Sequence, residues 1–183
     1  MAKGRDVAEQ LAALDDGAAD HLAVGRRLPD LRLPAANGGH ITLADQPGRV
    51  VLYCYSWTGR PGLANPPHWD DIPGAHGSTP QTEGFRDLYR EFQALGVPVF
   101  GLSTQTSAFQ REMVQRLRVP FAVLSDADLK FAAALRLPCF ATGGVSYLKR
   151  LTMVVEDGAI ARVFYPVHQP QDNARKLLDW LAA

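Results

Sequence analysis

The sequence predicts an α/β fold in which a central mixed β-sheet is flanked by helices. Short apolar runs rich in β-branched and aromatic residues alternate along the chain with stretches whose apolar residues recur at helical spacing. The last two apolar runs are joined by a tight turn and followed by one more helix. After an opening hairpin, the order is therefore β-α-β-α-β-α-β-β-α, which is typical of a thioredoxin-like sandwich with an N-terminal β-hairpin.

The N-terminal elements follow from local patterns. Apolar residues at helical spacing predict a short helix from Asp6 to Leu14, which forms a helical extension over residues 1–24 before a domain at 25–183. The stretch LPDLRLPAANGGHITLAD alternates apolar and polar residues around an Asn-Gly-Gly turn, so it predicts a hairpin. The continuous apolar run GRVVLYCYSW predicts a central strand that is covered on both faces.

A long loop rich in proline and glycine runs from Gly59 to Gly77, and we expect it to be functional or mobile. A helix is predicted after it from Thr79 to Leu95, with Ser78 or Thr79 as its cap. The remaining elements are a strand (VPVFGLST), a helix (TSAFQREMVQRLRV), a strand (FAVLSD), a helix (ADLKFAAALRL), a hairpin turning at Asp157-Gly158 (LKRLTMVVEDGAIARVFYPV) and a closing helix (QPQDNARKLLDWLAA).

The composition argues against several classes of protein. The 183 residues suffice for one domain, and 19 basic residues balance 19 acidic ones, so no net charge favours nucleic acid or an anionic membrane. No signal peptide or membrane-spanning stretch is evident, which predicts a cytoplasmic protein. The two cysteines, Cys54 and Cys139, are too far apart in sequence for a Cys-x-x-Cys pair or a metal knuckle.

Ser78 occupies a position suited to an anion. The first turn of a helix has unpaired backbone N–H groups and the positive end of the helix dipole. A thiol at such a position becomes reactive as a thiolate, and an arginine from elsewhere in the chain would stabilise it further.

From Gly25 onward the chain resembles a peroxiredoxin of the alkyl hydroperoxide reductase/thiol-specific antioxidant family. GRRLPDLRLPAANGGHITLADQPGRVVLYCYS is similar to that family's opening hairpin and first core strand, and VFGLSTQ and LKRLTMVVEDG resemble later strands. GSTPQTEGFRD resembles the stretch in which the bacterioferritin comigratory branch carries its peroxidatic cysteine. The resemblance implies a thiol peroxidase that reduces hydrogen peroxide or organic hydroperoxides without a cofactor. An external thiol, thioredoxin-like or of low molecular weight, would regenerate it, and a homodimer is one possible assembly.

The resemblance also assigns roles to residues. It places Ser78 at the peroxidatic cysteine position and Arg150 on the arginine that polarises the peroxide. Thr79, Gln81 and Thr58 are expected at the substrate, as polar neighbours of the nucleophile and as a fragment of the family's Pro-x-x-x-Thr-x-x-Cys pattern.

The sequence departs from the family in two further places. Ala75 occupies the threonine position of that pattern, with Pro73 five residues before Ser78, so the pattern is not intact. Glu83 stands where some relatives keep a resolving cysteine on the same helix.

The serine itself should prevent peroxide reduction, because a hydroxyl is un-ionised near neutrality and has no reversible counterpart of a sulfenic acid. Three explanations stay open. A native cysteine has been exchanged for serine, or the thiol was lost naturally and the cleft binds something or performs another reaction, or another cysteine has taken over.

Other interpretations of the same residues are weaker. His76 beside Ser78 suggests Ser-His-Asp hydrolysis, but no Gly-x-Ser-x-Gly elbow is present. His68, Asp70, Asp71 and His76 suggest a metal site, although solvated turn residues explain them more simply, and we expect no metal. Cys139 fits a resolving thiol less well than a half-buried structural residue, and Cys54 is expected to be buried in its strand.

Overall fold

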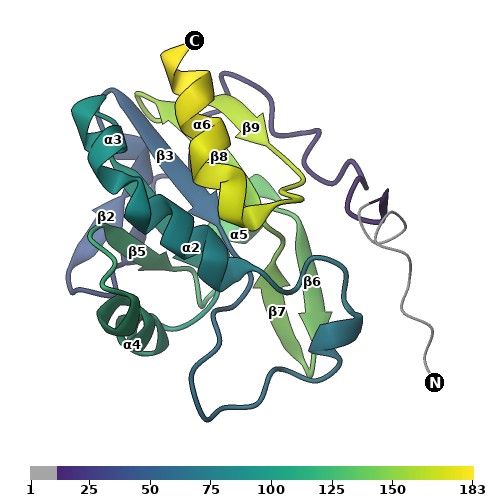
Figure 1. Ribbon diagram of the computed structural model, residues 1–183. Helices are drawn as coiled ribbons and strands as arrows, with labels where there is room; N and C mark the ends of the chain where they lie inside the picture. The colour runs from purple at the N-terminus through teal and green to yellow at the C-terminus, as the bar shows by residue number, and fades with distance from the viewer. Residues whose placement is uncertain (1–11) are drawn as a thin grey trace.

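A five-stranded mixed sheet forms the centre of the computed structural model, which describes residues 12–183 (Figure 1). Its strand order is β5-β4-β3-β8-β9, in which β3, β4 and β5 run parallel while β8 and β9 join antiparallel. The strands are β3 (Arg49–Cys54), β4 (Val99–Ser103), β5 (Ala122–Ser125), β8 (Leu151–Glu156) and β9 (Ala159–Phe164). This topology confirms the predicted α/β, thioredoxin-like fold.

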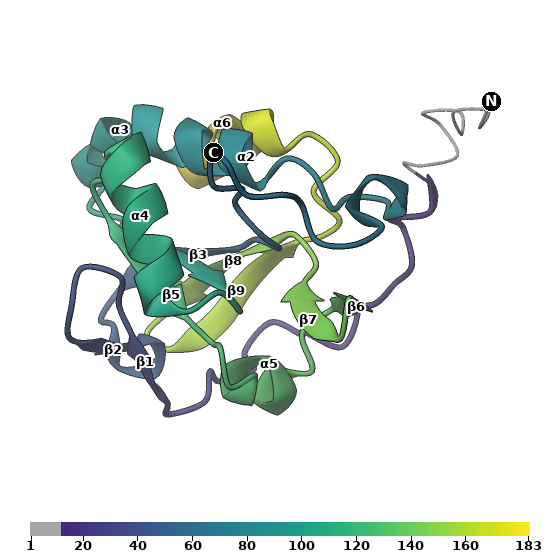
Figure 2. The same cartoon turned by 90° about the horizontal axis from the view of Figure 1, so that it is seen from below.

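Helices cover both faces of this sheet, as Figure 2 shows. One face packs against α2 (Ser78–Asp87), α3 (Tyr89–Ala94), α4 (Ser107–Leu117) and α6 (Asn173–Ala182), and the other against α5 (Lys130–Leu135). Side chains alternate across a strand, so Val51 and Tyr53 of β3 join the first core while Leu52 and Cys54 join the second. The apolar run of β3 is thus buried on both faces, as its composition predicts.

Two small hairpins lie outside the central sheet. The predicted hairpin is formed by β1 (Arg32–Pro34) and β2 (His40–Thr42). A second hairpin, β6 (Cys139–Thr142) with β7 (Val145–Leu148), was not predicted. Its strands are four residues long and only partly buried, so they lack the apolar runs that revealed the central strands. Short 3-10 turns, η1 (Leu43–Asp45), η2 (Trp69–Asp71) and η3 (Pro170–Asp172), complete the elements.

The helix predicted from Thr79 to Leu95 is two helices. The backbone leaves helical geometry at Leu88, with φ −97° and ψ 5°, between α2 and α3. Apolar residues keep helical spacing across the break, so the periodicity does not show it. The predicted side-chain cap is also wrong, because α2 begins at Ser78 after Gly77, and neither Ser78 nor Thr79 caps it.

The predicted helix from Asp6 to Leu14 lies almost entirely outside the described residues. The part that is described runs along the loops that follow β7 and β9. The hydroxyl of Tyr165 donates to Asp16 Oδ1 at 2.7 Å, Lys149 Nζ donates to Asp16 Oδ2, and His168 Nε2 lies 3.4 Å from Asp15 Oδ1. These contacts attach the segment before residue 25 to the domain.

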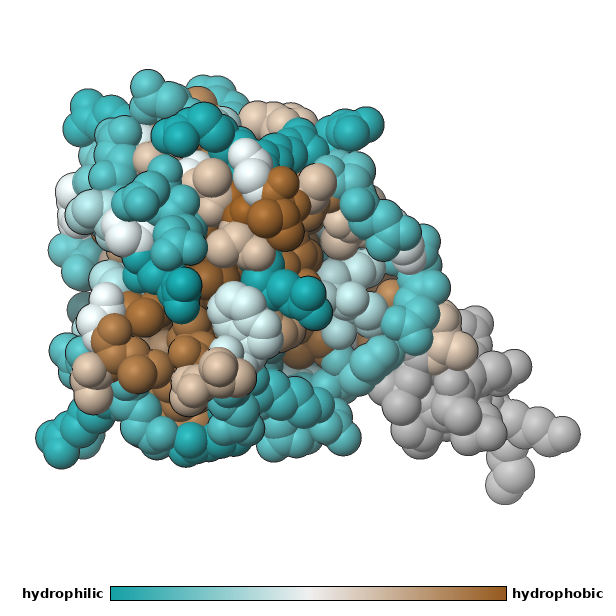
Figure 3. Space-filling model, turned by 90° about the horizontal axis from the view of Figure 1, so that it is seen from above, coloured by the Kyte–Doolittle hydropathy of each residue, from teal (hydrophilic) through white to brown (hydrophobic). Residues whose placement is uncertain are grey.

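The surface is largely hydrophilic with separate apolar areas, as the face in Figure 3 shows. Large apolar side chains exposed in the described part include Val24, Leu63, Leu95, Val145 and Trp180. Within residues 12–183, no helix combines the length and the apolar character needed to cross a membrane.

Gly77 and Gly38 allow a matched test of how α2 begins. Both have a left-handed backbone, with φ 108° and 100°, but a Cβ on Gly77 would lie 2.5 Å from Pro170 Cγ, whereas a Cβ on Gly38 meets nothing within 4 Å. We expect Gly38→Ala to lower the free energy of unfolding by about 1–2 kcal/mol through backbone strain alone. Gly77→Ala should cost about 1–3 kcal/mol more, because Pro170 must move. Urea denaturation measures both, and equal losses would contradict the close approach.

Asp16 should make stability depend on pH in the acid range. Burial opposes its ionisation, but hydrogen bonds from Lys149, Tyr165 and the Ala18 N–H outweigh that effect and lower the pKa of Asp16 from 3.8 to about 2. Because the folded-state pKa is the lower one, the stabilisation is present above the unfolded pKa and is lost as pH falls toward 2. Asp16→Asn should remove this part of the pH dependence, measured by denaturation over a pH series. Asp30→Asn, at an exposed aspartate, is the control and should leave it intact.

Candidate active site

Ser78 lies at the first turn of α2, beneath a hollow of about 260 Å³. Only 1% of the residue is exposed, so its hydroxyl forms part of the floor of the hollow rather than its rim. The lining includes Trp57, Asn65, Trp69, His76, Thr79 and Pro80. Of the predicted site residues, Thr79 therefore lies beside Ser78 in the wall of the hollow.

Three groups surround the Ser78 hydroxyl oxygen. Arg150 Nη1 donates to it at 3.2 Å, the backbone N–H of Trp57 donates at 3.4 Å, and Ser56 Oγ lies 3.3 Å away. The single proton of the Ser56 hydroxyl goes to the carbonyl oxygen of Ala75 at 3.2 Å. In the contact between the two serines, the Ser78 hydroxyl must then donate to Ser56 Oγ. The Ser78 oxygen itself accepts from the Arg150 guanidinium and from the backbone N–H of Trp57.

Arg150 is a buried cation without an acidic partner among residues 12–183. It lies between β7 and β8, is 6% exposed, and its Nη2 donates to the carbonyl oxygens of Gly74 and His76. Burial lowers the pKa of Arg150 to about 10, so the guanidinium stays protonated at neutral pH. Among the ion pairs of residues 12–183, none involves Arg150, so an anion at the Ser78 position would be the first to balance its charge.

This arrangement suits an anionic atom at the position of the Ser78 oxygen. Two N–H donors point at it, one of them charged, and it lies at the positive end of α2. The Ser56 hydroxyl becomes a third donor if it rotates away from Ala75. A thiol at this position would be held as a thiolate, whereas a serine hydroxyl stays neutral.

The loop between Gly59 and Gly77 is attached at both ends and in the middle. Arg116 Nη2 donates to the carbonyl oxygen of Gly59 at 2.9 Å, and the Thr142 hydroxyl of β6 donates to that of Pro67. Trp69 is buried and packs edge-on against Trp57, with ring centroids 5.5 Å apart, and against Tyr147 at 5.0 Å. These contacts hold the loop over the hollow, so the wall of the site is built from several parts of the chain.

Two of the predicted site residues make their contacts elsewhere. The Thr58 N–H and hydroxyl both donate to Gln105 Oε1, at 3.1 and 3.2 Å, and not to Ser78. Gln81 Nε2 donates to Asn173 Oδ1 at 3.0 Å, which also accepts from Thr152 at 2.7 Å. Gln81 is fully buried and ties α2 to α6 and β8, so it supports the helix behind the site.

Hydrolase geometry is not formed in the described part of the chain. The His76 ring pairs with Asp70, Nε2 to Oδ1 at 2.7 Å, and makes no hydrogen bond to Ser78. His68 pairs separately with Asp71 at 3.8 Å. Residues 12–183 hold no cluster of three or more metal-ligating side chains, so these four residues are two exposed pairs.

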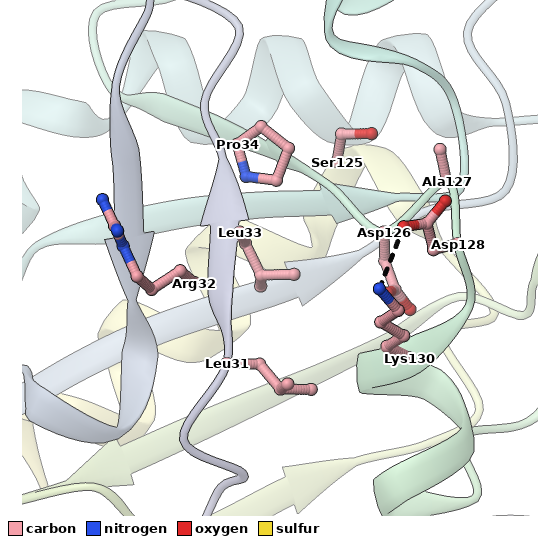
Figure 4. A pocket seen from close by; sticks show the side chains of 9 residues that line it. All are labelled: Leu31, Arg32, Leu33, Pro34, Ser125, Asp126, Ala127, Asp128 and Lys130. Atoms are coloured by element: carbon pink, nitrogen blue, oxygen red, sulfur yellow. Dashed lines mark ion pairs between the residues drawn. The ribbon is translucent and has the colours of Figure 1, made fainter.

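A second hollow, of about 170 Å³, lies between β1 and the turn from β5 to α5 (Figure 4). Leu31 and Leu33 point toward it, and Lys130 forms an ion pair with Asp128 at 3.3 Å. Asp126 is buried, but its carboxylate already accepts the backbone N–H groups of Phe131 and Ala132 at the start of α5. The Asp126 carboxylate therefore stabilises the start of α5.

Comparison with known proteins identifies the family of the chain. Residues 23–178 match the family model described as Redoxin. The chain belongs to the redoxin family. Within that family it groups with peroxiredoxins of the bcp and Q type. The predicted membership of the peroxiredoxin family is therefore confirmed.

Three similar proteins illustrate the relationship. The putative peroxiredoxin bcp of Coxiella burnetii is 32% identical over 108 residues, 58% of this chain and 62% of the relative. The chloroplastic peroxiredoxin Q of Sedum lineare is 31% identical over 144 residues, 76% of this chain and 74% of the relative. The crystal structure of peroxidoxin BcpB from Mycobacterium tuberculosis has a TM-score of 0.72 at 26% identity, covering 88% of this chain and 97% of that one. This redoxin spans less than two thirds of some of its curated relatives.

Neither cysteine of this redoxin has the setting of a reactive thiol. Cys54 is fully buried, and burial raises its pKa. Cys139 is exposed rather than half-buried as predicted, and its thiol donates to the carbonyl oxygen of Leu137 at 3.3 Å. Desolvation of the sulfur, together with nearby Asp126, raises the pKa of Cys139. Takeover of the chemistry by either thiol is therefore disfavoured.

Ser56 and the Trp57 N–H both reach Ser78, but neither was among the predicted site residues. The available signal was their position, because they follow the carboxyl end of β3, and sites of open α/β sheets lie at that end of the strands. Position alone does not show that a serine and a backbone N–H point at one atom.

Ser56 should act as an anion donor once Ser78→Cys supplies a thiol as a reporter. In the S78C protein, Ser56→Ala should raise the pKa of the introduced thiol, because the thiolate loses one hydrogen-bond donor. The pH dependence of alkylation by iodoacetamide measures this pKa. Ser125→Ala removes a buried hydroxyl that donates to the Gln105 carbonyl, and as the control it should leave the thiol pKa unchanged.

Proposed function

We propose that this chain carries the active site of a thiol peroxidase, in a form silenced by serine at position 78. The observation that supports the proposal is the contact between Ser78 Oγ and the buried guanidinium of Arg150, which has no acidic partner among the described residues. With cysteine at position 78, the substrate would be hydrogen peroxide or an organic hydroperoxide. The whole protein's activity is proposed from this site, since the chain spans only part of several relatives.

Peroxide reduction at this site would transfer one oxygen atom to sulfur. The thiolate sulfur attacks one peroxide oxygen, an S–O bond forms, and the O–O bond breaks. The attacked oxygen stays on sulfur with its hydrogen, which gives a sulfenic acid, and the leaving oxygen departs with the electron pair of the O–O bond. It is protonated from solvent, which received one proton when the thiol ionised, so the products are the sulfenic acid and water or an alcohol. Arg150 is placed to stabilise the negative charge as it moves from sulfur to the leaving oxygen.

The sulfenic acid would be reduced by an external thiol. Glu83, at the position of a same-helix resolving cysteine, pairs with Arg86 at 3.7 Å and offers no sulfur. Cys54 is buried, and Cys139 has a raised pKa.

The two cysteines form no disulfide, which supports the cytoplasm as the compartment of the protein, because thiols stay reduced there.

With serine, the site would be a binding module. The Ser78 oxygen accepts two N–H donors, but no base contacts it among the described residues, so it has no means of becoming a nucleophile. The hollow above it remains open and polar enough to hold a small ligand.

Ser78→Cys tests the proposal. We expect the S78C protein to consume hydrogen peroxide and tert-butyl hydroperoxide with dithiothreitol as reductant, while the serine form shows only the background rate. Adding Arg150→Lys to S78C should slow the reaction roughly 10²–10³-fold, because the charge is kept but the paired N–H geometry is lost.

Cys139→Ser in the S78C protein is the control and should leave the rate unchanged. If the S78C protein is folded and its new thiol is alkylated, yet it consumes no peroxide, the binding-module function is the correct one. The codon at position 78 of the gene separates an exchanged residue from a native serine.

A further inference from the structure

The segment Leu14–Asp16, which we call the N-terminal strap, contacts the surroundings of Arg150 from outside the family match. That match begins at residue 23, so the strap lies before the matched region. It touches three segments: the end of the loop before α2, the residue next to Arg150, and the loop between β9 and α6.

Asp16 holds the residue that precedes Arg150. Its carboxylate accepts from Lys149 Nζ and from the Tyr165 hydroxyl, the latter at 2.7 Å. The backbone N–H of Lys149 donates to the carbonyl oxygen of Pro138 at 2.8 Å. Lys149 is therefore fixed through its side chain and its backbone. This restricts the backbone position of the adjacent Arg150, and hence where its side chain can lie relative to Ser78.

Leu14 supports an acceptor of the same guanidinium. A Cβ built on Gly74 would lie 2.7 Å from Leu14 Cδ2, so the leucine packs directly on that glycine. The carbonyl oxygen of Gly74 accepts from Arg150 Nη2. Leu14 lines a void of about 20 Å³ beside Arg150, and Gly74, Lys149 and Tyr165 are among its other lining residues. The strap therefore packs against the space next to the guanidinium.

We propose that Asp16 is a positioning residue of the site, which fixes Arg150 against residue 78 through Lys149 and so controls how fast a thiol there reacts with peroxide. The expected effect on the peroxide reaction rate rests on the proposed function. The effect on the position of Arg150 does not, and it is tested separately through the pKa of a thiol at position 78.

Electrostatics and positioning predict opposite signs when Asp16 loses its charge. Removing a negative charge near the site would by itself favour the thiolate and lower the thiol pKa. If Asp16 instead acts by placing Arg150, its removal weakens the contact with the thiolate and raises the thiol pKa. The direction of the change therefore identifies the mechanism.

The experiment compares the S78C protein with S78C/D16N over the full chain. We expect a higher thiol pKa from the pH profile of iodoacetamide alkylation, and a roughly tenfold slower reaction with hydrogen peroxide, since small misplacements of a reacting group are costly. Glu91→Gln is the matched control, because it removes a carboxylate from an exposed pair with Arg175, at 2.8 Å, between α3 and α6. It should change neither quantity.

Lys149→Met provides a second variant on the same path. If Asp16 acts through Lys149, the two substitutions together should slow the reaction no more than the stronger one alone. If the rate reductions of the two single substitutions multiply in the double variant, the proposed path through Lys149 is overturned. A thiol pKa that falls or stays constant in S78C/D16N would overturn the positioning role. If S78C itself consumes no peroxide, the proposed function fails, and the alkylation profile still decides the inference.

Discussion

The buried guanidinium of Arg150, which pairs with no carboxylate of the described residues, is the constraint on which the site depends. Burial lowers the pKa of Arg150, but only to about 10, so the charge persists in the folded protein. The groups that receive its hydrogen bonds are two backbone carbonyls and one hydroxyl, all neutral. Since those carbonyls belong to Gly74 and His76, the hydrogen bonds from Arg150 Nη2 also fix the end of the long loop and hence the start of α2. The position of Ser78 follows from the same contacts that stabilise the cation.

The sheet explains how distant residues meet there. Cys54 at the end of β3 pairs with Leu151 at the start of the antiparallel β8. The residues just after β3 and just before β8 therefore leave the sheet at the same edge and level. Ser56 and Trp57 come from one strand and Arg150 from the other, while α2 brings Ser78 between them. The helix dipole, the backbone N–H and the guanidinium converge on one atom because of strand register, and no motif in the sequence encodes that convergence directly.

The sequence was informative where a feature repeats along the chain. Buried strands and amphipathic helices have periodic signals, so the five strands of the sheet and the closing helix were predictable. The β6–β7 hairpin and the break at Leu88 were not, since short half-exposed strands and a local change of ψ leave the apolar pattern unaltered. At the site, family resemblance named Ser78, Arg150, Thr58 and Gln81, but it did not give the partners of Thr58 and Gln81. Their hydrogen bonds go to Gln105 and Asn173, because partner choice depends on distances set by the packed structure.

The oxygen at position 78 lies where the surrounding donors would also suit a thiolate. The hydroxyl accepts the same N–H donors as a thiolate would, so the contacts around it are satisfied and α2 still begins at Ser78. A buried cation is different, because its desolvation costs free energy that neutral acceptors offset only in part, and an apolar residue of similar volume usually serves stability as well or better. The fold alone therefore gives little reason for Arg150. Its presence is best explained by an anion that the pocket is built to meet, whether a thiolate in a cysteine form or a bound ligand in the serine form.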